Sequence, residues 1–202
     1  MLFRSLKKSA NITNGNALQI DWETIVPKNE LSYILGNPPF VGSKMMTVEQ
    51  RNDVLKEANN IKGSGVLDYV TAWYFKASKF IQGTKIKAAF VSTNSITQGE
   101  QVSIIWSELL NNYKIKIHFA HKTFKWSNEA KGNAAVYCVI IGFSKFDIPK
   151  KRLFEYENIK SNPTERIVSH INPYLLEAKD IFILPRTKPL NNRSSLNTEL
   201  EA

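Results

Sequence analysis

The chain of 202 residues is 43% hydrophobic and carries 27 Lys and Arg against 18 Asp and Glu, a net charge of +9. This length predicts one domain with a sizeable core and a tail, and the basic charge favours a polyanionic partner such as nucleic acid. No apolar run approaches the roughly 18 residues of a membrane span, and the amino terminus lacks the apolar segment of a signal peptide, so we expect a soluble, cytoplasmic protein with no membrane partner.

The first predicted elements form a strand, a helix and a second strand. Residues 31–36 (LSYILG) and 85–93 (KIKAAFVST) are short apolar runs that end in polar, turn-forming residues, which is typical of buried parallel strands. Between them, apolar side chains recur at three- and four-residue steps over residues 67–81 and stop near Gly83. This spacing predicts an amphipathic helix, and the three elements together predict a βαβ unit.

The second half of the chain predicts a helix over 100–111, a strand with one wet face over 114–120 and a further strand over 134–143. The single cysteine, Cys138, lies in the last of these apolar runs, so we expect a small core residue. One cysteine excludes an internal disulfide and a multi-cysteine zinc site, and we predict no metal site. Residues 161–202 have weak periodicity and four prolines, which indicates linker or irregular structure.

Asn37 follows the first predicted strand and is followed in turn by Pro38, Pro39 and Phe40. Ligands of open α/β sheets bind beyond the carboxyl ends of the strands, and the two prolines restrict the backbone on either side of the asparagine. A fixed amide oxygen beside a fixed backbone carbonyl can accept both protons of an –NH₂ group and so free the nitrogen lone pair for attack. Phe40 offers a ring on which a flat base can stack. Taken alone, the four residues equally fit an asparagine that caps a turn in a loop.

The surrounding sequence resembles a known family. The run Asn37 to Phe40 looks like the catalytic motif of amino-group DNA methyltransferases, which methylate adenine N6 with S-adenosylmethionine. The runs GNPPFVGSKMM, SGVLDYVTAWYFKA, AAFVSTNSITQGEQV and HFAHKTFKWSNEAKGNAAVYCVIIGF resemble the methyltransferase region of large single-chain type II restriction-modification enzymes over residues 14–190. The resemblance implies an α/β fold, a class I S-adenosylmethionine-dependent methyltransferase with a Rossmann-like sheet, and a bacterial source.

The resemblance also implies roles for particular residues. Asn37, Pro38, Pro39 and Phe40 would form the site for the adenine amine. Asn16 matches the position where related enzymes hold the adenine ring of the cofactor, although an aspartate is common there. Trp73 matches an aromatic residue that packs on the same ring, and its alternative role is the core face of a helix.

Further residues would contact DNA. Phe124 matches the aromatic residue that stacks on the flipped base, with Trp126 as the alternative, and we expect both in an exposed loop between two strands. Four lysines flank these segments and would contact phosphates of double-stranded DNA, or else be solvated surface charges: Lys44, Lys122, Lys125 and Lys131. His118 and His121 are expected to be structural residues at a strand end.

The chain departs from the family at its start. The family has a seven-stranded sheet of order 3-2-1-4-5-7-6, and no glycine-rich loop for the methionine part of the cofactor precedes Asn16. We therefore expect a partial sheet that lacks the first strands, with residues 1–148 as the carboxyl-terminal part of the catalytic domain and 149–202 as a linker towards a target-recognition domain.

A partial sheet has consequences for function. The S-adenosylmethionine site would be incomplete in this chain, and the open sheet edge would favour self-association. Two other functions remain open at this point: an inactive nucleic-acid-binding remnant, and an amino-group methyltransferase that acts on RNA or on protein glutamine.

Overall fold

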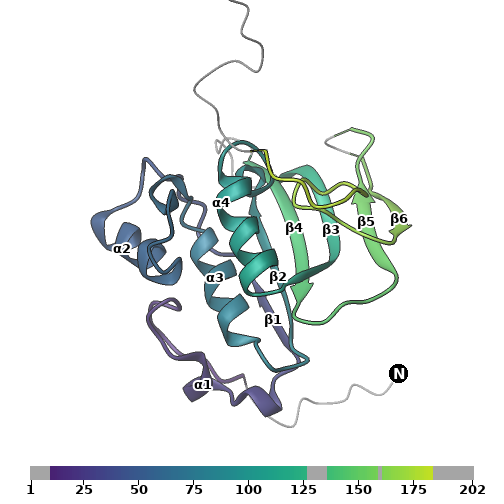
Figure 1. Ribbon diagram of the computed structural model, residues 1–202. Coiled ribbons are helices and arrows are strands. Elements are labelled where there is room, and N and C mark those ends of the chain that lie inside the picture. The colour runs from purple at the N-terminus through teal and green to yellow at the C-terminus, as the bar shows by residue number, and fades with distance from the viewer. Residues whose placement is uncertain (1–9, 127–135, 159–160, 184–202) are drawn as a thin grey trace, which may run out of the picture.

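The computed structural model describes residues 10–126, 136–158 and 161–183 (Figure 1). In this part of the chain, six strands form one sheet of order β1-β2-β4-β3-β5-β6. The pairs β1·β2 and β3·β5 are parallel, and the other neighbours are antiparallel. The strands are Tyr33–Gly36 (β1), Lys87–Thr93 (β2), Lys116–Trp126 (β3), Val136–Ser144 (β4), Lys151–Glu155 (β5) and Thr164–Val168 (β6).

Helices connect the strands in the first half of the chain. They are Trp22–Ile25 (α1), Val48–Glu57 (α2), Thr71–Phe80 (α3) and Gln101–Ser107 (α4), the last of which continues as a π-helical turn over Glu108–Asn112. In Figure 1, α3 and α4 cross in front of the sheet and α2 lies beyond α3. Thr47 starts α2 with a capping box, in which its side chain and that of Gln50 each bond the other's backbone N–H.

The core forms where α3 and α4 meet the sheet. The ring of Tyr74 on α3 lies 5.2 Å from Phe90 on β2, 5.4 Å from Phe143 on β4 and 6.0 Å from Trp106 on α4, measured between centroids. All four rings are buried, and the Tyr74 hydroxyl forms a 2.8 Å hydrogen bond with the Ser92 hydroxyl. Aromatic side chains of this size supply a large part of the burial that stabilises a domain.

The predicted strand-helix-strand unit is confirmed, because β1 and β2 are parallel neighbours with α3 between them in the sequence. The strands begin two residues later than predicted, and α3 begins at Thr71 instead of residue 67. Residues 69–70 instead form a turn, across which the Thr71 hydroxyl donates to the Asp68 carbonyl at 2.7 Å. The short α1 and the whole of α2 were not predicted, because α2 is largely polar and shows no clear apolar stripe.

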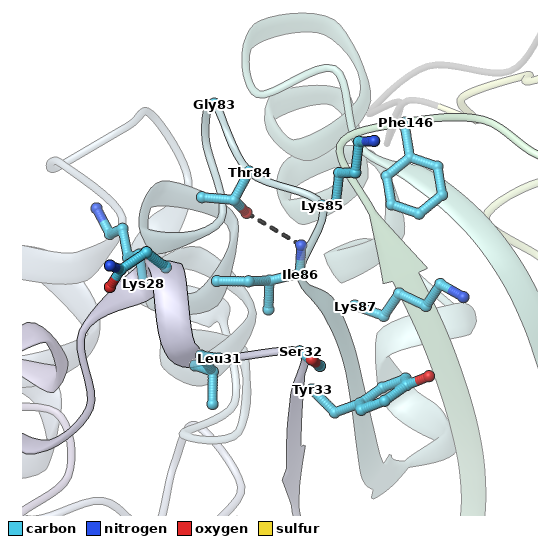
Figure 2. Close-up of a pocket in the computed structure, with 11 residues that line it drawn as sticks. Lys28, Leu31, Ser32, Tyr33, Gly83, Thr84, Lys85, Ile86, Lys87 and Phe146 are labelled. Carbon is cyan, nitrogen blue, oxygen red and sulfur yellow. Dashed lines mark hydrogen bonds between the residues drawn. The ribbon is translucent and has the colours of Figure 1, made fainter.

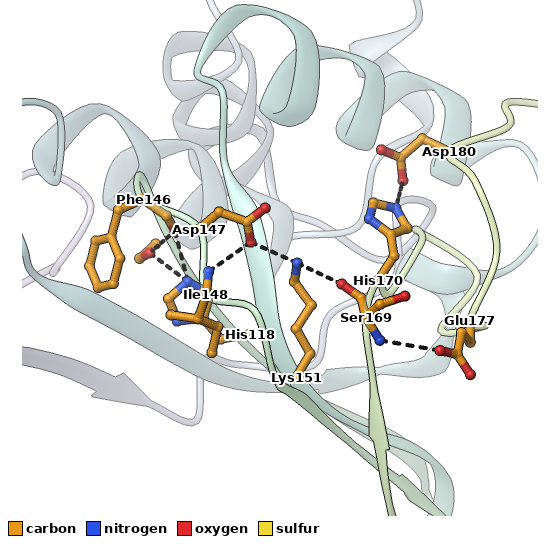
Figure 3. A network of polar contacts seen from close by, with 10 residues as sticks. His118, Phe146, Asp147, Ile148, Lys151, Ser169, His170, Glu177 and Asp180 are labelled. Atoms are coloured by element: carbon orange, nitrogen blue, oxygen red, sulfur yellow. Dashed lines mark hydrogen bonds and ion pairs between the residues drawn. The ribbon is translucent and has the colours of Figure 1, made fainter.

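The prediction of irregular structure after residue 160 is wrong at β6, which pairs with β5 and extends the sheet. Figure 3 shows polar contacts that fix this region. The buried ammonium of Lys151 donates to Asp147 Oδ1 at 2.6 Å and to the Ser169 carbonyl at 3.3 Å. His170 Nε2 lies 2.9 Å from Asp180 Oδ1. Such side-chain contacts leave no periodic signal in the sequence.

One edge of the sheet is open in the described part of the chain, since β1 pairs there with β2 alone. Tyr33 and Leu35 on this strand are 60% and 75% exposed. An exposed apolar edge strand is a site at which another strand can pair. Among the described residues, no helix has the length and apolar character needed to cross a membrane.

Candidate functional site

The loop from Asn37 to Phe40 begins at the carboxyl end of β1. Pro38 is buried, Phe40 is half-buried and Asn37 is exposed. Within the described part of the chain, the Asn37 side chain makes no hydrogen bond, so its amide is free to bind a ligand. The backbone turns directly after this segment, where the Val41 N–H donates to the Pro39 carbonyl at 3.2 Å.

Contacts beyond Phe40 hold the loop against the start of α3. The Tyr69 N–H donates to the Val41 carbonyl at 2.9 Å. The guanidinium of Arg51, on α2, donates to the carbonyls of Ser43 and Gly65. Sequence reasoning missed Arg51, because a half-buried arginine on a polar helix looks like an ordinary surface charge. Two segments far apart in the sequence therefore position the residues that follow the Asn-Pro-Pro-Phe motif.

The two predicted cofactor residues are both linked to Tyr69, Asn16 through hydrogen bonds to Asp53 and Trp73 through a ring contact. Asn16 Nδ2 donates to Asp53 Oδ2 at 2.9 Å, and the Tyr69 hydroxyl donates to the same oxygen at 3.1 Å. The Tyr69 ring makes an edge contact with the half-buried Trp73 at 5.0 Å between centroids. Burial, together with the Asp53 carboxylate, raises the pKa of Tyr69 to about 12, so its hydroxyl stays protonated as a donor. Asp53 is a buried carboxylate that sequence reasoning missed.

The Asn16 side chain is engaged on both of its polar atoms. Its Nδ2 donates to Asp53, and its Oδ1 accepts from the Leu18 N–H at 3.0 Å. An amide has two N–H groups and two acceptor lone pairs, so each atom retains capacity for one more contact. Trp73 is oriented by Tyr69 and retains exposed surface. These residues therefore offer a ligand the exposed part of the Trp73 ring and the remaining hydrogen-bonding capacity of the Asn16 amide.

The predicted base-stacking residues lie on a strand and not in a loop, which corrects the expectation for residues 123–126. β3 runs to Trp126 and includes Phe124, whereas residues 127–135 lie outside the described part of the chain. Phe124 is half-buried and stacks on Tyr156 at 5.5 Å between centroids, and Trp126 is 38% exposed at 6.1 Å from Phe124. Tyr156 in turn bonds His121 Nδ1 at 2.8 Å.

Strand register brings Phe124 to the same end of the sheet as Asn37. Gly36 pairs with Phe90, and β2 continues to Thr93, which pairs with Cys138 on β4. Cys138 pairs in turn with Phe124 on β3. Three strand spacings of about 4.8 Å separate β1 from β3, roughly 14 Å in all. The amide and the ring therefore lie at one end of the sheet, on either side of the ends of β2 and β4.

The predicted phosphate-contacting lysines differ in their surroundings. Lys44 and Lys125 are exposed, and neither takes part in an ion pair within the described part of the chain. Lys122 forms an ion pair with Glu155, which occupies its ammonium group. Lys131 lies outside the described residues. Of the three lysines that the structure describes, Lys44 and Lys125 are thus available for phosphate as they stand.

His118, His121 and Cys138 have structural surroundings. His118 Nε2 donates to the Phe146 carbonyl at 2.8 Å and also lies 2.9 Å from the Ser144 hydroxyl (Figure 3). Burial lowers the pKa of both histidines, so each favours the neutral form. Cys138 is fully buried, as predicted, and burial raises the pKa of its thiol to about 11.

A cavity of about 700 Å³ lies at the opposite end of the sheet, around the first residues of β1 and β2. Figure 2 shows Lys87 extending beside Tyr33 and Phe146, and its ammonium lies 5.9 Å from each ring centroid. None of the predicted site residues lines this cavity. Among the described residues, no cluster of three or more His, Cys, Asp or Glu side chains is placed to hold a metal ion.

Comparisons with known proteins place these features in a family. Residues 3–155 match the family model described as MmeI, DNA-methyltransferase domain. DNA methyltransferase A of Bacillus subtilis (strain 168) is 42% identical over 195 residues, which is 95% of this chain and 21% of that protein. A solved structure of the type IIL restriction-modification enzyme MmeI in complex with DNA is 49% identical, with a TM-score of 0.88 over 92% of this chain and 25% of that one. The chain thus spans about a quarter or less of the length of these relatives.

Proposed function

Because the chain belongs to the MmeI DNA-methyltransferase domain family, we propose that it carries the base-methylating face of a DNA methyltransferase acting on the N6 amine of adenine. The observation that carries this proposal is the exposed amide of Asn37 at the carboxyl end of β1, which makes no hydrogen bond to any described residue. Ligand sites of open α/β sheets lie at such strand ends. The MmeI structure is a complex with DNA, which supports duplex DNA as the partner of this chain.

The chemistry follows from the two acceptors at the start of the loop. Asn37 Oδ1 and the Pro38 carbonyl accept the two hydrogens of the adenine amine, which favours a tetrahedral nitrogen with a localised lone pair. S-adenosylmethionine supplies an electrophilic methyl carbon. The nitrogen attacks this carbon, the new N–C bond forms as the S–C bond breaks, and the surplus proton leaves the nitrogen for solvent. Both acceptors interact most strongly with the transition state, so they act on turnover.

The target base reaches this loop only when it leaves the DNA stack. Phe40 and Phe124 provide ring faces on the two sides of the site, and base stacking on an aromatic ring contributes about 1–3 kcal/mol. Lys44 and Lys125 supply positive charge for the phosphates, whose contacts orient the duplex without reading its sequence. In this proposal the strand ends bind the flipped base, and Lys44 and Lys125 bind the phosphate backbone of the DNA.

Trp73 and Asn16 fit the adenine end of the cofactor, because they offer an exposed aromatic surface and a partly used amide. Neither strand end at β1 or β2 carries a glycine-rich turn, and glycine-rich turns allow a backbone to approach a ligand closely. We infer that the methionine end of the cofactor depends on residues outside the described part of the chain. The 202-residue chain alone then binds S-adenosylmethionine weakly, and calorimetric titration that gives micromolar affinity would contradict this inference.

The proposal is tested by methyl transfer from labelled S-adenosylmethionine to duplex DNA, in a full-length methyltransferase that contains this segment. We expect N6-methyladenine as the product. Asn37→Ala should lower turnover by about 10²- to 10³-fold, the loss typical of removing one transition-state hydrogen bond, while DNA affinity is retained. Asn52→Ala, at an exposed position on α2, is the control and should keep full turnover. Unchanged turnover in Asn37→Ala would reduce Asn37 to a turn cap.

A further inference from the structure

Asp68 is a buried carboxylate outside the Asn-Pro-Pro-Phe motif. It immediately precedes the turn that starts α3 and is 9% exposed. Its Oδ1 accepts from the Ser43 N–H at 2.8 Å, and its Oδ2 accepts from the Ser95 hydroxyl at 2.6 Å. One side chain therefore joins the segment after the Asn-Pro-Pro-Phe motif to the segment that follows β2.

These two contacts complete the attachment of the loop. Its first end is fixed by the pairing of Gly36 with Phe90. Its second end is fixed at Val41 by the Tyr69 N–H and at Ser43 by Asp68. The prolines restrict the loop internally, but they do not set its orientation relative to β2. Asp68 provides that link, because the Ser95 hydroxyl that it binds lies only two residues beyond the end of β2.

We propose that Asp68 is a positioning residue for methyl transfer, which holds the Asn37 amide and the Pro38 carbonyl in register with the cofactor side of the site. This inference rests on the proposed function. Two adjacent acceptors must meet both hydrogens of one small amine, so a shift of the whole loop weakens both contacts together. A misplacement of about 1 Å at a reacting group can cost roughly 100-fold in rate.

The surroundings of Asp68 predict which substitutions are tolerated. Asparagine has the same shape, and its Oδ1 can accept from the Ser43 N–H as before. Its Nδ2 can donate to the Ser95 hydroxyl oxygen, whose own hydrogen then turns to Thr93 Oγ1, 2.8 Å away. Asp68→Asn therefore keeps both links, whereas Asp68→Ala removes both and leaves the half-buried Ser43 N–H without its partner.

Glu57, the last residue of α2, offers a matched control because it contacts the other end of α3. It is also a buried carboxylate, 7% exposed, and it pairs at 3.2 Å with Lys79 in the last turn of α3. Glu57→Ala removes a buried acceptor from the last turn of α3 without touching the loop. A stability loss alone therefore affects both alanine variants, whereas a loss of loop position affects Asp68→Ala alone.

The experiment measures kcat and KM for methyl transfer in a full-length methyltransferase that contains this segment. We expect Asp68→Ala to lower kcat about 100-fold while its KM values stay within about threefold of the wild type. Asp68→Asn should retain at least a tenth of the wild-type kcat, and Glu57→Ala should retain the full wild-type kcat. On the 202-residue chain, amide hydrogen exchange should quicken at Ser43 in Asp68→Ala only. Unchanged kcat in Asp68→Ala, or equal losses in Asp68→Ala and Glu57→Ala, would overturn the proposal.

Asn37→Ala in the same assay separates two kinds of failure. If Asn37→Ala abolishes turnover while Asp68→Ala leaves it intact, the loop is catalytic and Asp68 does not position it. If both variants keep full turnover, the proposed chemistry of the loop itself is wrong.

Discussion

Phe124 allows a sharp test of whether the aromatic side chains at the end of β3 bind a base or only pack together. Its ring stacks on Tyr156 at 5.5 Å and lies 6.1 Å from Trp126 and 6.4 Å from His121. Phe124 is nevertheless only half-buried, so part of the ring surface stays open to a ligand. Phe124→Ala removes both the packing and the open surface, and the two losses have different sizes and different readouts.

The base-stacking contribution is about 1–3 kcal/mol, which corresponds to about a 5- to 150-fold fall in the population of the flipped state. The packing contribution beyond buried area is about 0.5–1.5 kcal/mol for one aromatic pair. A domain of ordinary stability, about 5–15 kcal/mol, stays folded after such a loss. Phe124→Ala should therefore give a folded protein that flips its target base poorly, and Phe124→Trp should retain flipping.

The assay uses duplex DNA with 2-aminopurine at the target position, because its fluorescence rises when the base leaves the stack. Phe154→Ala is the matched control in a full-length methyltransferase that contains this segment. Phe154 is also half-buried and stacks on His121 at 4.2 Å, but it has no predicted contact with the base. The reasoning is refuted if Phe154→Ala reduces the fluorescence as much as Phe124→Ala does, or if Phe124→Ala leaves it unchanged.

Two further predictions concern the chain as a folded unit. Burial lowers the pKa of His118 and His121 below the ordinary value of 6.5, so the unfolded state binds more protons than the folded state. The free energy of unfolding therefore falls as the pH drops below about 6.5, by at most about 1.4 kcal/mol per pH unit for each histidine. Urea unfolding at pH 7.5 and 5.5 measures this fall; His118→Gln should make it shallower, and equal stability at both values would contradict it. The open edge of β1 should cause concentration-dependent association in sedimentation, which Leu35→Lys should weaken. Met45→Lys, at an 80% exposed loop position, should not weaken it, and a wild-type monomer at all concentrations would count against this prediction.

Periodic apolar patterns were sufficient to predict the elements that form the centre of the fold. Among the apolar steps that predict a helix over 67–81, Ala77 and Phe80 are buried on α3, and Tyr69 and Ile81 are buried just outside its two ends. The apolar second half of the 85–93 run became β2, which lies between two neighbouring strands. These predictions succeeded because burial of a whole face repeats along the sequence with the period of the element.

The residues that hold the site together leave no such pattern. Asp53 and Asp68 are single carboxylates in polar or mixed surroundings, and each is buried because donors from two other segments converge on it. Asp53 accepts from Asn16 and Gln19 in one segment and from Tyr69 in another, and Asp68 accepts from Ser43 and from Ser95. A buried carboxylate without partners would cost several kcal/mol, so the donors must be in place before the burial is tolerable. Their positions depend on the completed fold, which a local pattern does not encode.

The same distinction separates the motif from its geometry. The Asn-Pro-Pro-Phe run identifies the acceptor and the ring, because the chemistry of an amine requires those residue types in a fixed order. The orientation of that loop depends instead on Ser43, Asp68 and Ser95, which come from three distant segments and whose residue types are common on any protein surface. If Asp68→Ala loses turnover while the motif is intact, the catalytic unit of this chain extends beyond the motif to the contacts that orient it.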